Sequence, residues 1–226
     1  MTYGPLPTMS VTNGLRQLPT MGVTNGRSPL PIVGVPSGRR RRIANRPDVL
    51  ALASLLLDYP DDALCALRSK LSDAVGALPR SVATTSLRQF LTWFDQTDPD
   101  QLRVDYVRTF DHKRRSALYV TFAEYGDTRA RGAALSRLRE YYRALGFSER
   151  EGELPDYLPT VLQFAALADV KQADEVLNQA RFGIVSIRMA LEAQHSPYAA
   201  VLKAIEVCLP ARPLPMAADV ELEAVV

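Results

Sequence analysis

The chain has 226 residues, of which 47% are hydrophobic and 23% charged, as in an ordinary soluble globular protein. No apolar run approaches the roughly 20 residues that cross a bilayer, and no secretory signal is recognisable, so we expect a cytoplasmic protein without a membrane span. The two cysteines, Cys65 and Cys208, lie in apolar helical patterns and should be reduced thiols. With two histidines the chain has four candidate ligands in total, which are too widely scattered for a zinc or iron–sulfur site that needs about four.

Charge and composition divide the chain into three parts. Residues 1–46 hold seven arginines, no other charged residue, and six each of the 12 glycines and 16 prolines, so we expect a disordered tail. Residues 211–226 include Asp219, Glu221 and Glu223 and are expected to form a flexible acidic tail. The remaining residues, 47–210, are predicted to form a single helical domain.

Helical periodicity begins immediately after the N-terminal tail. A first helix should start at Asp48 and is stopped by Pro60, because proline cannot continue a helix. A second helix should run from about Asp61 through residue 75, since its apolar residues recur at steps of three and four. The apolar face of a third helix is formed by Leu87, Phe90, Leu91 and Phe94.

The middle of the chain continues the helical pattern. Asp98, followed by a proline, is typical of a helix N-terminus and predicts a fourth helix, with one face formed by Leu102, Tyr106 and Phe110. Residues 114–125 are apolar enough for a buried helix. Asp127 or Thr128 should cap the next helix, which Gly146 ends.

The last third of the domain contains three further helical segments. Two apolar stripes run over residues 158–168 and 176–191, and a final helix is expected over residues 198–209. Runs of alternating, β-branched residues, which strands require, do not occur. The sequence therefore predicts an all-α, single-domain bundle of about eight or nine helices.

Motifs for catalysis are missing from the sequence. It has no glycine-rich phosphate loop, no nucleophile elbow and no paired metal-ligand motif, and its carboxylates do not form a recognisable acid–base couple. These observations argue against an enzyme. Two unusual segments stand out instead, one over residues 106–132 and one over residues 153–164.

The two segments carry a combined motif. The first contains Tyr-Val-Arg-Thr-Phe-Asp and then Gly-Asp-Thr-Arg-Ala-Arg-Gly, and the second begins Glu-Leu-Pro-Asp-Tyr-Leu-Pro. In this order, in an all-helical chain of this length, the motifs resemble those of the molybdenum cofactor assembly chaperones of respiratory nitrate reductase. These chaperones are the delta-subunit or NarJ type within the TorD-like family of redox enzyme maturation chaperones. The resemblance extends over residues 48–209. It departs from the family pattern at Tyr157 and Gln163, where many members have His and Glu.

The resemblance implies a chaperone that binds the immature molybdenum-containing catalytic (alpha) subunit, alone or with the beta subunit, through its N-terminal segment. It would hold that client open for bis-molybdopterin guanine dinucleotide and iron–sulfur clusters without binding a cofactor stably itself. Proteins of molybdenum cofactor biosynthesis would be further partners, and nucleic acid would not be one.

The motif residues are the candidates for binding the client peptide. Aromatic and aliphatic residues would form the walls of a groove for an amphipathic helix. The alternative is that the motif is structural, with Asp156 capping a helix or pairing with an arginine, and Gly126 and Gly132 making a tight turn or a close backbone approach. The candidates are Tyr106, Phe110, Asp111, Leu118, Tyr119, Arg129, Arg131, Glu153, Asp156, Tyr157 and Gln163.

Two other functions remain open at this point. The run Arg39–Arg42 could attach a helical adaptor to nucleic acid or to a membrane surface, although it lacks interleaved aromatic residues and a recognition helix. A small nucleotide-handling enzyme is the third alternative, and the missing phosphate loop argues against it.

Overall fold

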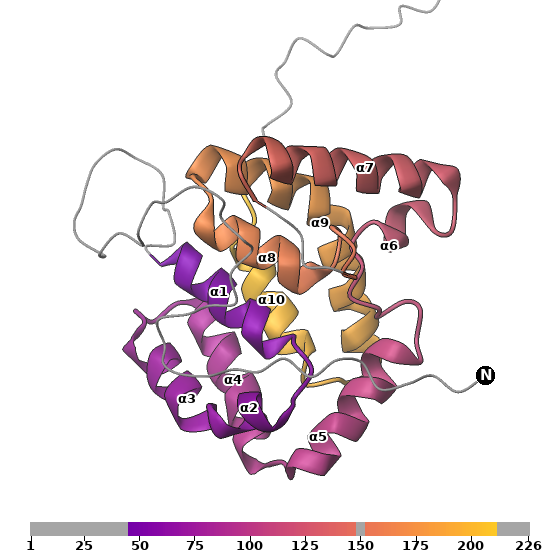
Figure 1. Ribbon diagram of the computed structural model, residues 1–226. Helices are drawn as coiled ribbons and strands as arrows, with labels where there is room; N and C mark the ends of the chain where they lie inside the picture. Colours follow the sequence, from indigo (N-terminus) through magenta and orange to yellow (C-terminus); the bar gives the residue numbers. More distant parts are fainter. Residues whose placement is uncertain (1–44, 148–151, 212–226) are drawn as a thin grey trace, which may run out of the picture.

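Three helices from distant parts of the chain lie side by side at the centre of the fold (Figure 1). They are α1 (Arg46–Leu56), α8 (Leu158–Leu167) and α10 (Ala199–Val207). The computed structural model describes residues 45–147 and 152–211, so the run Arg39–Arg42 and nearly all of both expected tails lie outside the described residues.

The all-α prediction is confirmed. The described residues form ten α-helices and no strand, and eight of the helices are at least eight residues long. Around the central three pack α4 (Val82–Gln96) and the longest helix, α9 (Val170–Ala193). At the N-terminus of α10 lies an aromatic cluster, in which the Tyr198 ring centre is 5.0 Å from that of Phe90 in α4 and 4.8 Å from that of Phe110. Burial of these large side chains is the main favourable term in folding.

The helix expected from Asp61 is divided in two, so its prediction as one helix was wrong. The Asp61 side chain accepts a hydrogen bond from the Leu64 amide and caps α2 (Asp62–Ala66). The chain then tightens at Leu67, whose amide bonds to the carbonyl only three residues earlier, and restarts as α3 (Arg68–Ala77).

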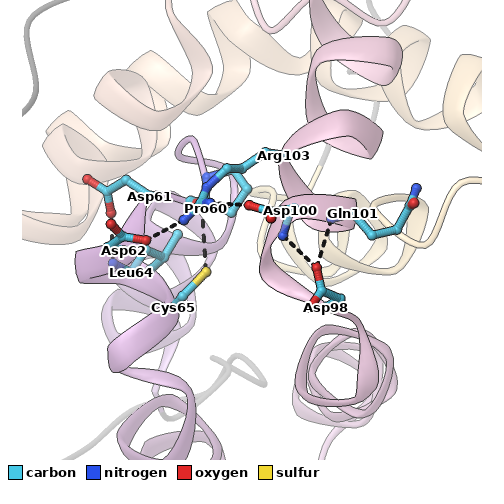
Figure 2. Close-up of polar contacts among 9 residues, drawn as sticks. All are labelled: Pro60, Asp61, Asp62, Leu64, Cys65, Asp98, Asp100, Gln101 and Arg103. Carbon is cyan, nitrogen blue, oxygen red and sulfur yellow. Dashed lines mark hydrogen bonds and ion pairs between the residues drawn. The ribbon is translucent and has the colours of Figure 1, made fainter.

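The helix predicted from Asp98 is confirmed as α5 (Pro99–Tyr106), with the Asp98 carboxylate accepting the Asp100 amide at 2.9 Å. It does not continue as an α-helix to Phe110, because residues Val107–Asp111 form a π-helical turn. Arg103 joins α5 to the start of α2, as Figure 2 shows. Its guanidinium contacts Asp62 and Asp100, the latter at 2.6 Å, and donates to the Pro60 carbonyl at 3.3 Å.

A buried helix over residues 114–125 was predicted wrongly. Only α6 (Phe122–Tyr125) is helical there, and the preceding residues form turns. Two backbone hydrogen bonds hold these turns against the start of α8. The Leu158 amide donates to the Leu118 carbonyl at 2.7 Å, and the Val120 amide donates to the Asp156 carbonyl at 3.0 Å. Only Ser116, Leu118, Val120 and Thr121 of this segment are buried, and the apolar composition of a turn that is buried in part does not distinguish it from a helix.

Helix α7 (Arg129–Ala144) lies at the edge of the bundle (Figure 1) and buries only Leu138 and Tyr142. Thr128 occupies its N-cap position, as predicted, but makes no capping bond and donates to the Tyr125 carbonyl at 2.7 Å. Gly146 ends the helix region at φ +79°, as expected.

Of the two motif glycines, only one makes a turn. Gly126 has φ +54°, a left-handed conformation that other residues rarely adopt, and it turns the chain between α6 and α7. Gly132 lies inside α7, and a Cβ there would meet no atom within 4 Å. The expected corner or close approach at Gly132 was therefore wrong.

The described residues contain no helix long and apolar enough to cross a membrane. Both cysteines are free thiols, as predicted, with Cys65 half-buried and Cys208 buried. Burial raises the pKa of the Cys208 thiol to about 12, so it remains protonated and unreactive at neutral pH.

Candidate functional site

Four tyrosines from three parts of the chain form a continuous row, which we call the tyrosine row. The Tyr59 ring meets Tyr106 edge-on at 5.5 Å, the Tyr106 and Tyr157 hydroxyls are 3.2 Å apart, and the Tyr157 and Tyr119 rings are 5.6 Å apart. The two ends are exposed, with Tyr59 at 45% and Tyr119 at 36% of their full surface, whereas Tyr106 is 5% exposed. The row thus begins at the surface with Tyr59, passes through buried Tyr106, and returns to the surface at Tyr119.

The hydroxyl protons in the row have defined directions. Tyr106 donates to the Leu57 carbonyl at 3.0 Å, so its single proton is used, and Tyr157 must donate to the Tyr106 oxygen. Burial, followed by the charge of Asp58, raises the pKa of Tyr157 well above its usual value. Burial also raises the pKa values of Tyr106 and Tyr119, so all three hydroxyls stay protonated at neutral pH.

Beneath Tyr119 lies a buried carboxylate, Asp156, which is 0% exposed. Its Oδ2 accepts the Thr121 hydroxyl at 2.5 Å and the Thr121 amide at 3.2 Å, and lies 3.3 Å from the Arg131 guanidinium. The prediction that Asp156 pairs with an arginine is confirmed. The alternative, that it caps a helix, was wrong, because Tyr157 is the N-cap of α8 and no side chain caps that helix.

Arg131 supports the Tyr119 end of the row. Its guanidinium carbon lies 5.7 Å from the Tyr119 ring centre and 5.3 Å from that of Phe122. A guanidinium over an aromatic face is attracted by the ring quadrupole and holds the ring in place. Since Arg131 is anchored by Asp156, the position of Tyr119 depends on a buried ion pair.

A small open pocket adjoins Tyr157. Glu153 is fixed at its side by the Thr160 hydroxyl at 2.8 Å, and the Ser54 hydroxyl donates to the Pro159 carbonyl at 2.8 Å. The residues that line it are Ser54, Asp58, Glu153, Tyr157, Pro159, Thr160 and Gln163. Asp58 and Glu153 contribute its carboxylates.

The structure brings together seven of the eleven candidate residues: Tyr106, Tyr119, Arg131, Glu153, Asp156, Tyr157 and Gln163. Phe110 and Leu118 are 4% and 2% exposed and belong to the core. Asp111 and Arg129 are exposed outside the row and the pocket, and partial burial raises the pKa of the Asp111 carboxyl.

Sequence reasoning missed Asp58, Tyr59 and Ser54. Ser54 lies in the last turn of α1 and the other two residues follow that helix, about 100 residues before the motif that they adjoin. Their only local signal was an acidic and an aromatic residue directly before the helix-stopping Pro60.

The chain matches a known protein family. A family model described as nitrate reductase delta subunit matches residues 76–204, which is more than half of the chain. The chain belongs to the nitrate reductase delta subunit family. The resemblance seen in the motifs is thereby confirmed, and so is the expectation that the chain belongs to a family of chaperones and not of enzymes.

Curated relatives agree with this family. The chain is 35% identical, over 70% of its length and 86% of the relative's, to a probable nitrate reductase molybdenum cofactor assembly chaperone, NarJ, of Bacillus subtilis. It is 31% identical to the NarJ chaperone of Escherichia coli, over 66% of this chain and 64% of that one. A nitrate reductase-like protein, NarX, of Mycobacterium tuberculosis is 32% identical over 68% of this chain but only 23% of its own length.

The fold of this chain also matches a solved structure. A crystal structure from Archaeoglobus fulgidus, assigned as a redox enzyme maturation protein, superposes with a TM-score of 0.56 at 23% identity. The match covers 80% of this chain and 98% of that one, so the two share a fold.

Proposed function

We propose that this chain is an assembly chaperone for a respiratory nitrate reductase, which binds the immature molybdenum-containing alpha subunit and keeps it competent for cofactor insertion. The observation that carries the proposal is the 35% identity to the Bacillus subtilis NarJ chaperone, which extends over 86% of that protein. Membership of the delta subunit family over residues 76–204 supports the same function.

The proposed client segment is the N-terminus of the alpha subunit, bound at the tyrosine row. Exposed Tyr59 and Tyr119, with Leu154 at 36% exposure, offer apolar surface beside the polar pocket. A segment with one apolar and one polar face fits such a surface, because aromatic anchors supply contact area at low entropic cost. Buried Tyr106 supports the exposed rings from beneath, and Phe110 and Leu118 hold the core under them.

The molybdenum cofactor and the iron–sulfur clusters are cargo of the client in this proposal. Among residues 45–147 and 152–211, no three His, Cys, Asp or Glu side chains gather as metal ligands would. In this proposal the chaperone itself holds a polypeptide segment, and its partners are the alpha subunit, alone or with the beta subunit, and the proteins that deliver cofactor.

The test is calorimetric titration with a synthetic peptide that covers the N-terminus of the cognate alpha subunit, with a scrambled peptide as control. We expect saturable binding of the native peptide alone. Tyr119→Ala should raise Kd by about tenfold, the effect of removing one aromatic anchor. Phe182→Ala is the matched control, because Phe182 is a 55% exposed aromatic residue on α9, outside the row.

The two possible failures have different meanings. No saturable binding of the native peptide would overturn the proposed function. Equal weakening by Tyr119→Ala and Phe182→Ala would leave the function standing and remove the tyrosine row as its site.

A further inference from the structure

The corner between α1 and α2 carries Tyr59, the first exposed member of the tyrosine row. Residues 58–61 have no helical backbone, so no helical hydrogen-bond ladder sets the position of this ring. Side chains of α5 hold the corner instead. We propose that one of them, Arg103, is a positioning residue of the client site, which fixes the backbone that carries Tyr59. The inference rests on the proposed function and adds to its site a residue that lies outside both motif segments.

The backbone of the corner is fastened to α5 at two points. The Tyr106 hydroxyl donates to the Leu57 carbonyl at 3.0 Å, and Arg103 Nε donates to the Pro60 carbonyl at 3.3 Å. Arg103 and Tyr106 are three residues apart, so they share one face of α5. Because Tyr59 lies between the two fastened carbonyls, a shift of its backbone works against both bonds.

Arg103 is itself oriented by both helices that it joins (Figure 2). Its guanidinium pairs with Asp62 in α2 and, at 2.6 Å, with Asp100 in α5. Both carboxylates are largely exposed, so these ion pairs add little stability. A planar guanidinium presents its donors in a fixed fork, however, and two carboxylates and one carbonyl together define how that fork lies. The contacts therefore direct Nε at the Pro60 carbonyl.

The place of the Tyr59 ring depends on this backbone. The ring is 45% exposed and meets Tyr106 edge-on at 5.5 Å, so much of its surface has no packing that would fix it. A client segment binds best to a ring that already stands in the bound position, because ordering the ring on binding reduces affinity. When only a fraction of the molecules hold the ring there, the apparent Kd rises by the inverse of that fraction. Arg103 thus affects the client through Tyr59.

The experiment is a double-mutant cycle, measured by calorimetric titration with the native N-terminal peptide of the alpha subunit. The variants are R103Q, Tyr59→Ala and the two combined, and thermal unfolding checks that each is folded during the titration. Arg88→Gln is the matched control, because Arg88 donates to the carbonyls of Val75 at 3.1 Å and Leu78 at 3.3 Å, at the end of α3. It removes the same charge and the same kind of bond from residues that do not belong to the row.

We expect Tyr59→Ala to raise Kd by about tenfold, the effect of losing one aromatic anchor. R103Q should raise Kd by about fivefold, less than removal of the ring, because the Tyr106 hydroxyl and the Cys65 thiol, which donates to the Pro60 carbonyl at 3.6 Å, still hold the corner. In the Tyr59→Ala background, R103Q should change Kd by less than about twofold, since no ring is left to position. Arg88→Gln should leave Kd unchanged in both backgrounds.

Arg103→Lys is a second, milder variant in case the glutamine variant does not fold. An ammonium group keeps the charge but lacks the fixed fork that reaches the carbonyl and both carboxylates at once. We expect this variant to raise Kd by about threefold, again only where Tyr59 is present.

Four results would overturn the inference. If Tyr59→Ala weakens binding while R103Q and Arg103→Lys do not, the proposed function stands and Arg103 does not position the ring. If R103Q weakens binding equally with and without Tyr59, the arginine acts on the fold as a whole. If Tyr59→Ala leaves Kd unchanged, Tyr59 does not contact the client and has no place to be held in. If the wild-type protein does not bind the peptide, the proposed function fails and this inference with it.

Discussion

At the residue scale, the most constrained group is the Asp156 carboxylate. It is fully buried, and one oxygen receives every hydrogen bond from Thr121 and Arg131, while the other has no partner among the described residues. A buried charge is tolerated only when it is paired and hydrogen-bonded. The ion pair therefore fixes the turn at Thr121, the start of α7 and the ring of Tyr119 together.

Replacement of Asp156 by alanine should destabilise the protein severely. It leaves the Arg131 guanidinium, 16% exposed, without its buried partner, so we expect a loss of about 3 kcal/mol in the free energy of unfolding. Urea denaturation measures this loss in the free energy of unfolding. Asp127→Ala is the control, because Asp127 pairs with Arg131 at 3.9 Å while 64% exposed, and its loss should cost under about 1 kcal/mol. Similar small losses in both variants would contradict the role given to Asp156.

Buried tyrosines predict a loss of stability at alkaline pH. Burial raises the pKa values of Tyr106, Tyr157 and Tyr198 above the ordinary value of 10.0. Above pH 10 the unfolded chain releases these protons while the folded chain retains them, so the folded state binds more protons and the free energy of unfolding falls as pH rises. Their contribution is complete below pH 10.

Urea titrations at a series of pH values, with tyrosinate absorbance measured in parallel, test this dependence. Tyr157→Phe should make the decline less steep, since it removes one of the groups that ionise on unfolding. Full ionisation of all tyrosines without any change in the unfolding free energy would show that the hydroxyls are not protected by the fold.

At the element scale, one close approach joins α9 to the turns before α6. A Cβ at Gly183 would lie 2.1 Å from the Val120 carbonyl oxygen and 2.6 Å from the Val120 Cα. Because these are backbone atoms, no side-chain rotation can relieve the contact. Glycine at position 183 therefore lets α9 approach the Val120 backbone, whose amide donates to the Asp156 carbonyl.

Alanine at position 183 should destabilise the protein although alanine favours helices. Helix propensity contributes a gain of about 1 kcal/mol, and overpacking costs about 1–3 kcal/mol or more, so we expect a net loss. Gly132→Ala in α7 is the matched control, where a Cβ meets nothing and stability should rise by about 1 kcal/mol. Thermal unfolding distinguishes the two variants by the sign of the change in Tm. A higher Tm for Gly183→Ala would refute the close approach.

At the scale of the whole molecule, local sequence signals predicted the features that depend on neighbouring residues, such as helix starts. The carboxylates of Asp61 and Asp98 cap helices where the sequence placed helix starts, because capping depends on bonds within one turn. The turns over residues 113–121 could not be predicted, since the partners of their buried residues, residues 156–158 and Gly183, lie far along the chain.

The candidate site divides in the same way. Its motif half, with Tyr119, Arg131 and Asp156, could be found because the residue types are unusual in short stretches of sequence. Its other half, Asp58 and Tyr59, follows α1 and carries no motif. Helical spacing could not separate Phe110, a core residue, from a groove residue, because both kinds of residue form apolar stripes.

The placement of the site leads to a prediction about the whole chain. The tyrosine row, the pocket and the family match over residues 76–204 all lie after residue 45. A variant that begins at residue 45 should therefore bind the client peptide with a Kd within about twofold of the full chain, as for changes remote from a site. Calorimetric titration of both proteins with the same peptide measures the ratio.

The full chain with Arg39–Arg42 replaced by glutamines is the matched control, because it removes the charge run and keeps the length. An adaptor that works through these arginines must lose its activity in both variants, whereas a chaperone that binds its client at the tyrosine row loses it in neither. Loss of peptide binding in the shortened chain and in the arginine variant alike would place the binding energy in the tail and remove it from the helical domain.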